Sequence, residues 1–390
     1  MVIFMKLYID ISVLTLATYV TGIQRVTREV TVRFLENSNF ETVLLHYNAA
    51  DNCYYRINNL SFLNYYIRQK GVKEKMITKT PVKLEEIAQG CIFFDLDAVW
   101  MGRIKRSYLL PVLKRQGAKI AVHIYDIIPV THPQYCLQRG VYCFMDYIGA
   151  HLIYADVIIT NAGATAGALD NLADAVKTPL PPCHIVPLGA DFNHAETVWE
   201  KEVGKNISTA AMKRPFLLMV GTLEPRKNHK LLLSAYDRGL KKMGCNLIFA
   251  GAVGWNMEQF TSALNNHPDY GTHIFHFEGL NDQEIFYLYQ KAQFVVFPSY
   301  TEGFGLPVVE AFVHGTPVLA ADIPVLREVG KEYAVYFKQD DADELCTKVM
   351  FYTEHNAEYE KIKQKLLAYR PISWKDSADK MEEIFMEELQ

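Results

Sequence analysis

From residue 216 onward, short apolar runs alternate with segments of helical length, and this alternation restricts the fold more than any other feature. The apolar runs are residues 216–220, 246–250, 274–277, 294–297, 317–320 and 334–337. Helical segments are predicted between them at residues 228–239, 257–266, 281–292 and 306–314. Strands that alternate with helices form a parallel sheet covered on both faces. The pattern therefore predicts an α/β, Rossmann-like domain.

The first half of the chain repeats this pattern less regularly. Its predicted strands are residues 3–9, 42–46, 91–94, 119–124, 156–160 and 184–186, and a helix is expected to start near Gly22. Since 390 residues exceed the usual size of one domain, a second Rossmann-like domain is expected.

A polar, aperiodic stretch that ends at Pro215 predicts the domain boundary. It gives a first domain at 1–187, a linker at 188–214 and a second domain at 215–372. Residues 373–390 have helical spacing and are expected to form a C-terminal helix that packs back on the first domain. Two such domains are expected to face each other across a cleft at the carboxyl ends of their strands, where open parallel sheets bind ligands.

Composition and charge exclude several classes of protein. Half of the residues are hydrophobic and 22% are charged, as in soluble globular proteins. Forty Lys and Arg against 44 Asp and Glu give no basic excess for a nucleic-acid partner. The seven cysteines contain no C-x-x-C pair and fit neither a disulfide framework nor a zinc site. Because Lys6 and Asp10 interrupt the apolar N-terminus, neither export nor membrane spanning is expected, and the expected location is the cytoplasm.

The sharpest chemical signal is a glycine-bearing loop bracketed by Glu302 and Glu310. It joins the predicted strand 294–297 to a helix and contains Gly303, Phe304, Gly305 and Leu306. The glycines let backbone amides approach a ligand, and a helix N-terminus favours phosphate. Carboxylates repel phosphate but accept hydrogen bonds from sugar hydroxyls, so a nucleotide sugar satisfies both parts. A simple capping loop with a solvated glutamate is the alternative.

A second signal follows the predicted strand 216–220. The segment Gly221-Thr222-Leu223-Glu224-Pro225-Arg226-Lys227-Asn228 places two cations at the carboxyl end of that strand. Arg226 and Lys227 could neutralise a diphosphate leaving group. Such a turn, taken alone, is more often a solvated surface loop.

Together the two motifs resemble those of the retaining glycosyltransferases of family 4, which have the GT-B fold. The resemblance includes Phe297-Pro298-Ser299 and Gly315-Thr316-Pro317-Val318 and covers most of the second domain. It implies that Glu302 lies at the sugar, Glu310 at the ribose, and Arg226 and Lys227 at the diphosphate. It also implies that the donor is bound by Thr222, Gly303, Phe304, Gly305 and Leu306, and by Gly22 in the first domain.

Two positions depart from the family pattern. Many members have Arg where Thr222 stands and His where Tyr125 stands, and Arg226 is expected to supply the missing cation. His123 and Asp126 are candidate catalytic residues, although His123 fits a buried histidine held by a backbone group equally well.

Asp95 and Asp97 follow a strand and are either acceptor contacts or, more often, strand-end caps. The aspartates lie away from the diphosphate motif, and Arg226 and Lys227 already supply positive charge there. No metal site and no cofactor are therefore expected.

The resemblance implies transfer of a sugar from a nucleotide-diphosphate sugar to a glycan or a polyprenyl-diphosphate-linked acceptor. GDP-mannose is the first choice, because the segment from Gly221 to Asn228 resembles bacterial mannosyl- and rhamnosyltransferases of surface-polysaccharide assembly. A GT-B epimerase or phosphorylase and an inactive nucleotide-sugar-binding protein are the alternatives.

Basic residues gather in two segments of the first half. One is 68–83, and the other holds Arg103, Lys105, Arg106, Lys114, Arg115 and Lys119. A basic face that contacts an anionic membrane is one interpretation. Ordinary solvated helix faces, with Tyr108, Leu109, Val112 and Leu113 in the core, are an equal alternative.

Overall fold

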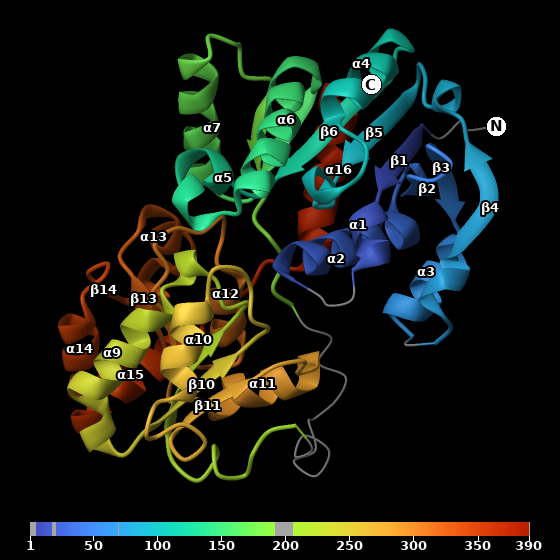
Figure 1. Ribbon diagram of the computed structural model, residues 1–390. Coiled ribbons are helices and arrows are strands. Elements are labelled where there is room, and N and C mark those ends of the chain that lie inside the picture. The colour runs from blue at the N-terminus through green and yellow to red at the C-terminus, as the bar shows by residue number, and fades with distance from the viewer. Residues whose placement is uncertain (1–4, 18–20, 69, 192–205, 390) are drawn as a thin grey trace. The chain divides into compact units, whose positions relative to one another are not determined.

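The computed structural model describes residues 5–17, 21–68, 70–191 and 206–389. Contacts within the chain divide it into two units, residues 1–189 with 372–390 and residues 190–371. Each unit is built around its own sheet, with helices on its faces (Figure 1). The α/β class predicted from the sequence is confirmed.

The first unit contains an eight-stranded sheet in the order β4-β3-β2-β1-β5-β6-β7-β8. The predicted strands correspond to six parallel strands, with residues 3 and 4 outside the described ranges: β1 (Lys6–Asp10), β2 (Glu41–Asn48), β5 (Cys91–Asp95), β6 (Lys119–Ile124), β7 (Val157–Thr160) and β8 (Cys183–Ile185). Two antiparallel strands at one edge of the sheet, β3 (Cys53–Ile57) and β4 (Ile77–Val82), are not predicted from the sequence.

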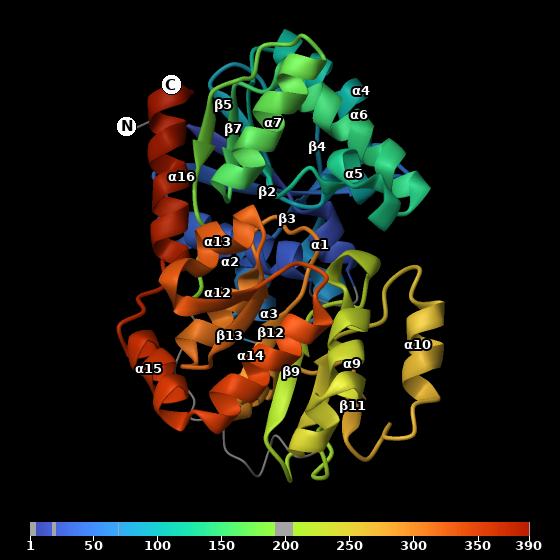
Figure 2. The same ribbon diagram turned by 90° about the vertical axis from the view of Figure 1, so that its left-hand side faces the viewer.

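Eight helices are described in the first unit. They are α1 (Ser12–Leu16), α2 (Gly22–Asn37), α3 (Asn59–Tyr66), α4 (Arg106–Arg115), α5 (Ile128–Thr131), α6 (Gln138–Tyr154), α7 (Gly163–Ala175) and α16 (Trp374–Glu388). The last of these, far from the others in sequence, lies along the sheet (Figure 2). Its Phe385 ring lies 6.1 Å from Phe34 of α2 and 5.0 Å from Phe94 of β5, measured between ring centroids. Aromatic packing thus fixes α16 to this unit.

The second unit contains a six-stranded parallel sheet in the order β11-β10-β9-β12-β13-β14. Its strands are β9 (Phe216–Val220), β10 (Asn246–Ala250), β11 (Ile274–Phe277), β12 (Phe294–Phe297), β13 (Val318–Ala321) and β14 (Ala334–Phe337). Every strand predicted for this half is present. All residues of the central β9 and β12 are buried, as expected when helices cover both faces.

The helices of the second unit follow its strands. They are α9 (His229–Arg238), α10 (Glu258–Asn265), α11 (Asp282–Lys291), α12 (Leu306–Val313), α13 (Pro324–Gly330), α14 (Ala342–Glu354) and α15 (Asn356–Leu367). Within the described ranges, no helix of either unit is both long and apolar enough to cross a membrane.

Glycines allow two neighbouring loops of the second unit to touch at the carboxyl edge of the sheet. A Cβ atom on Gly251, which follows β10, would lie 2.2 Å from the carbonyl oxygen of Gly221, which follows β9. A Cβ on Gly254 would lie 2.6 Å from the carbonyl oxygen of Leu223. Only glycine permits this approach. The turn that carries Arg226 and Lys227 is therefore held against the loop after β10.

Candidate active site

The two predicted motifs of the second unit lie in contact. Strands β9 and β12 are neighbours in the sheet, so the loops that follow them emerge side by side. The amide of Tyr300 donates to the carbonyl of Arg226 at 2.8 Å, and Arg226 Nη1 donates to the carbonyl of Thr301 at 3.1 Å. Residues about 75 positions apart in sequence thus form one site.

The centre of this site is a cluster of two cations and two carboxylates. Arg226 Nη1 lies 2.5 Å from Glu302 Oε2, and Lys227 Nζ lies 3.0 Å from Glu302 Oε1. Arg226 Nη2 lies 2.6 Å from Glu224 Oε1. The sequence motifs predict that the two cations contact a diphosphate and that Glu302 contacts a sugar. The structure pairs these groups directly with one another.

Glu302 is ionised at neutral pH and has both carboxylate oxygens engaged. Burial raises its pKa, but the charges of Arg226 and Lys227 outweigh burial and hold the pKa at about 2. The hydroxyl of Ser299, which is fully buried, also donates to Glu302 Oε1 at 2.8 Å. Glu302 therefore fixes the positions of both cations.

The loop after Glu302 leads into α12. Gly303, Phe304 and Gly305 are buried, and Gly305 has a φ of +97°, a left-handed conformation that favours glycine. A Cβ on Gly305 would lie 2.9 Å from the side chain of Leu326. The N-terminus of α12, which starts at Leu306, suits an anion, although the amide of Val308 already donates to the carbonyl of Gly305 at 2.9 Å.

Glu310 lies in the second turn of α12 and is buried. Its Oε2 accepts a hydrogen bond of 2.7 Å from the hydroxyl of Tyr289 on α11. The Tyr289 ring is stacked on His314, with ring centroids 5.7 Å apart. The carboxylate of Glu310 is thus oriented by a tyrosine that the sequence analysis did not single out.

Gly22 in the first unit is the first residue of α2 and is exposed. Thr21 and Gln24 form a capping box around it. Thr222, in the second unit, lies in the loop held against Gly254. The donor contacts expected of Gly22 and Thr222 stay predictions.

His123 is fully buried, and its ring stacks on Tyr125 at a centroid distance of 4.3 Å. Neither ring nitrogen has a partner among the described residues, so the backbone contact expected as an alternative is absent. Burial lowers the pKa of His123 to about 3, which makes it neutral at pH 7. Asp126 Oδ1 accepts from the amide of Ile128, at the start of α5, at 2.9 Å.

Asp95 and Asp97 have no exposed surface, so neither acts as the acceptor contact considered above. Asp95 forms two hydrogen bonds of 2.7 Å with Arg106, and Arg106 also binds Asp10 at 2.7 Å. Asp97 accepts from the amide of Leu14 in α1 at 2.7 Å and therefore caps a neighbouring segment. The strand-end cap applies to Asp97, and Asp95 belongs to a buried ion cluster.

The basic face expected around α4 needs correction. The Arg106 side chain is only 1% exposed, because it lies between Asp10 and Asp95. Lys114 is paired with Asp156 at 2.8 Å, while Tyr108, expected in the core, is 69% exposed. The exposed bases of this segment include Arg103, Lys105 and Arg115.

Sequence reasoning missed three residues that shape the site: Glu224, Ser299 and Tyr289. Glu224 lies inside the quoted motif, where the alternation Glu-Pro-Arg could have indicated a charge pair. Ser299 lies three residues before Glu302, within reach of a turn. Tyr289 gives no such signal, because its helical spacing alone indicates only a core position.

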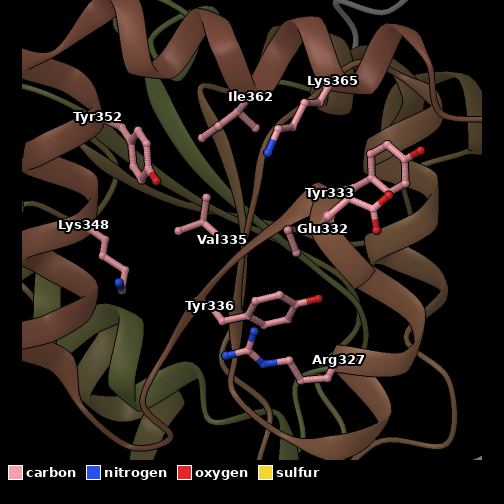
Figure 3. A pocket seen from close by; sticks show the side chains of 10 residues that line it. Arg327, Glu332, Tyr333, Val335, Tyr336, Lys348, Tyr352, Ile362 and Lys365 are labelled. Atoms are coloured by element: carbon pink, nitrogen blue, oxygen red, sulfur yellow. The ribbon is translucent and has the colours of Figure 1, made fainter.

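A cavity of about 290 Å³ lies elsewhere in the second unit, beside β14, α14 and α15 (Figure 3). None of the motif residues lines it. Its basic residues are partly neutralised, since Arg327 pairs with Asp322 and Lys348 with Glu344. Across the described ranges, no group of three or more His, Cys, Asp or Glu side chains could hold a metal ion.

Comparison with known proteins matches part of the chain to a glycosyltransferase family. Residues 200–366 match the family model described as glycosyl transferases group 1. The serotype-specific mannosyltransferase WbdA of Escherichia coli is 27% identical over 360 residues, which cover 88% of this chain and 41% of that protein. The O-antigen chain mannosyltransferase B of Escherichia coli is 32% identical over 137 residues, which cover 35% of this chain and 36% of that protein. This chain thus spans about two fifths of the length of the WbdA relatives.

Solved structures show the same architecture. Anabaena HepE in complex with UDP-glucose superposes with a TM-score of 0.70 at 13% identity, covering 98% of this chain and all of that one. Sucrose-phosphate synthase from Thermosynechococcus elongatus superposes with a TM-score of 0.61 at 14% identity, covering 98% of each chain. Residues 200–366 thus match the glycosyl transferases group 1 family, and the chain has the GT-B fold.

Proposed function

We propose that this chain is a retaining glycosyltransferase that takes its sugar from a nucleotide-diphosphate sugar. The observation that carries the proposal is the contact of Arg226 and Lys227 with Glu302 at the carboxyl edge of the sheet. Cations, a carboxylate and the N-terminus of α12 together suit a ligand that has both phosphates and hydroxyl groups. The group 1 domain supports the same conclusion.

The proposed donor is GDP-mannose. Two relatives from Escherichia coli carry the name mannosyltransferase, whereas the Anabaena neighbour was solved with UDP-glucose. A thermal-shift screen of GDP, UDP and dTDP, each alone and with its sugars, tests the choice, since only a bound ligand stabilises the fold by mass action. GDP and GDP-mannose should give the largest shifts. Stabilisation by UDP compounds alone would contradict GDP-mannose as the donor but would leave the proposed sugar transfer intact.

The proposed mechanism is electrostatic. The leaving diphosphate departs with partial dissociation, and its own oxygen accepts the proton of the acceptor hydroxyl. Arg226, Lys227 and the α12 terminus stabilise the growing negative charge, an effect of about 10²–10³ in rate for each donor removed. Asp95 is engaged by Arg106, and Asp97 accepts from the amides of Leu14 and Ala98, so we do not propose this pair of aspartates as a metal site.

We infer that activity survives chelation. Turnover measured in EDTA should match turnover in buffer. Loss of activity that Mn²⁺ or Mg²⁺ restores would contradict this proposal and require another site for the metal.

The two glutamates are proposed to act on different parts of the donor. Glu302→Gln should reduce turnover while the nucleoside diphosphate still binds, because Glu302 holds the cations near the reacting sugar. Glu310→Gln should weaken binding of the nucleoside diphosphate itself. Calorimetry and steady-state kinetics on both variants separate these effects, and the reverse assignment would follow from the opposite pattern.

Product analysis decides between transfer and the alternatives. A radiolabelled donor sugar that appears in a glycan with its anomeric configuration retained supports the proposal. Conversion of one nucleotide sugar into another would indicate an epimerase, and formation of a free sugar phosphate from a glycan would indicate a phosphorylase. Binding with no turnover on any acceptor would favour an inactive binding protein.

The proposed acceptor is a glycan on polyprenyl diphosphate at the cytoplasmic face of a membrane. Relatives named for O-antigen chains and the exposed bases Arg103, Lys105 and Arg115 support it. Co-sedimentation with anionic vesicles, lost when these three residues become Gln, tests the contact. Arg106 is left unchanged because it is buried. Equal binding to neutral vesicles would favour a water-soluble glycan.

A further inference from the structure

We propose that Glu224 is a built-in counter-ion, which holds Arg226 in the free protein and is exchanged for phosphate oxygens when a nucleotide-diphosphate sugar binds. The inference rests on the proposed function and adds a positioning residue to the same site. The family resemblance given above assigns no role to this glutamate.

The guanidinium of Arg226 lies in a fork between two carboxylates. One of its terminal nitrogens is 2.6 Å from Glu224, and the other is 2.5 Å from Glu302. The Glu224 side chain is 6% exposed, whereas that of Arg226 is 18% exposed. A ligand can therefore reach the Arg226 guanidinium more easily than it can reach the Glu224 carboxylate.

The Glu302 carboxylate has more partners than the Glu224 carboxylate. Glu302 is engaged by Arg226, Lys227 and Ser299, at distances of 2.5, 3.0 and 2.8 Å. The side chain of Glu224 has Arg226 as its single partner among the described residues. Exchange at Glu224 breaks one contact, whereas exchange at Glu302 would dismantle the whole cluster. Phosphate is therefore expected to replace Glu224.

The net charge explains why exchange is needed. Arg226 and Lys227 contribute two positive charges, and Glu224 and Glu302 contribute two negative charges, so the free cluster is neutral. A neutral cluster attracts a distant anion weakly. A diphosphate carries more negative charge than the carboxylate it displaces, so exchange favours diphosphates over singly charged anions.

Glu224→Gln tests the proposal because it keeps the shape of the side chain and removes its charge. Calorimetry would measure binding of GDP and of UDP to the wild type and to the variant. The nucleoside diphosphate that the wild type binds should bind about tenfold more tightly to the variant. Its affinity should also fall more steeply with salt, because the cluster then carries a net positive charge.

Two further variants control the experiment. Glu354→Gln removes the same charge from an exposed position of α14 and should leave both affinity and salt dependence unchanged. Glu224→Asp retains the charge and should not tighten binding. Melting temperatures of all variants verify that each is folded.

A purely structural role for Glu224 predicts the opposite sign. If Glu224 only braced the turn, its replacement by Gln would weaken binding and leave the salt dependence unchanged, and either result would overturn the inference. Failure of the wild type to bind any nucleoside diphosphate would instead overturn the proposed function together with the inference. Binding by the wild type that is unchanged in Glu224→Gln rejects the counter-ion alone.

Discussion

Lys227 is enclosed on several sides, and this placement makes it sensitive to substitution. Its Nζ lies 3.0 Å from Glu302 and 5.2 Å from the centre of the Phe297 ring. A Cβ on Gly221 would lie 3.2 Å from Lys227 Cε, so glycine leaves room for the lysine stem. These contacts therefore hold the Lys227 ammonium group beside the Glu302 carboxylate.

Lys227→Met should reduce kcat by about 10²–10³ and change KM less, because negative charge on the leaving group grows toward the transition state. Steady-state kinetics measure both constants. Lys230→Met, at an exposed position of α9, is the matched control and should behave as the wild type. Near-normal turnover of Lys227→Met would remove the phosphate role from this residue.

Glu302 should make the free energy of unfolding depend on pH in the acidic range. Its pKa is about 2 in the folded chain and ordinarily 4.5, so its contribution is complete above about pH 4.5 and is lost as the pH falls towards 2. Urea unfolding at several pH values should show this loss in the wild type and a shallower dependence in Glu302→Gln. If the free energy of unfolding depended on pH equally in both proteins, the low pKa of Glu302 would be contradicted.

The sequence predicted the site residues as two separate loops, and it could not predict their direct contact. Whether the loops after β9 and β12 meet depends on the order of strands in the sheet, where β12 pairs with β9 although β10 and β11 intervene in the chain. Local patterns contain no information on that order. The pairing of Arg226 with Glu302 follows from the order of strands in the sheet.

The elements of the first unit are joined by a buried ion cluster. Arg106, on α4, binds Asp10 at the end of β1 and Asp95 at the end of β5. His151 of α6 lies 2.9 Å from Asp95 and joins a second helix to the same carboxylate. Buried charges are stable only when each has its partner. Asp95 thus links helices α4 and α6 to the sheet, through Arg106 and His151 respectively.

Arg106→Met should lower the free energy of unfolding by about 3–5 kcal/mol, because two buried carboxylates lose their partner. Urea denaturation of the full chain measures the change. Arg115→Gln, at an exposed position of the same helix, should alter the free energy of unfolding by less than about 0.5 kcal/mol. Equal effects of the two substitutions would show that Arg106 is not held as described.

The two strands that were not predicted from the sequence are both partly exposed. The β4 segment contains Lys79 and Pro81 and has exposed residues at 79–81, so it lacks the apolar run that identifies the central strands. Proline is tolerated there because β4 is an edge strand. Residues 53–57, which form β3, are mostly partly buried and include Arg56. Antiparallel edge strands of this kind are specified by pairing more than by composition.

At the scale of the whole molecule, the second unit is an insertion in the first. The chain leaves the first unit after Gly189 and returns to it at Ile372. A Cβ on Gly189 would lie 2.4 Å from the backbone nitrogen of Trp374. The segment that leaves the first unit therefore contacts the segment that returns to it. Helical spacing in the sequence identifies the apolar face of α16, but not the aromatic rings of α2 and β5 that it covers.

Phe385→Ala should destabilise the first unit by about 3–5 kcal/mol, since the ring is fully buried between α2 and β5. Differential scanning calorimetry should show a lower melting temperature. Binding of a nucleoside diphosphate to the second unit should be retained at temperatures below that transition. Glu387→Ala, on the exposed side of α16, is the control. A normal melting temperature for Phe385→Ala would mean that α16 is dispensable.

The position of α16 has a consequence for the order of folding on the ribosome. Residues are added from the N-terminus, and domains generally fold as units during synthesis. The sheet of the first unit emerges early, but the face against Phe34 and Phe94 stays uncovered until α16 has been made. Residues 190–371 have all emerged before then. The first unit is thus completed after the second. The second unit can fold before α16, the last helix of the first unit, has been made.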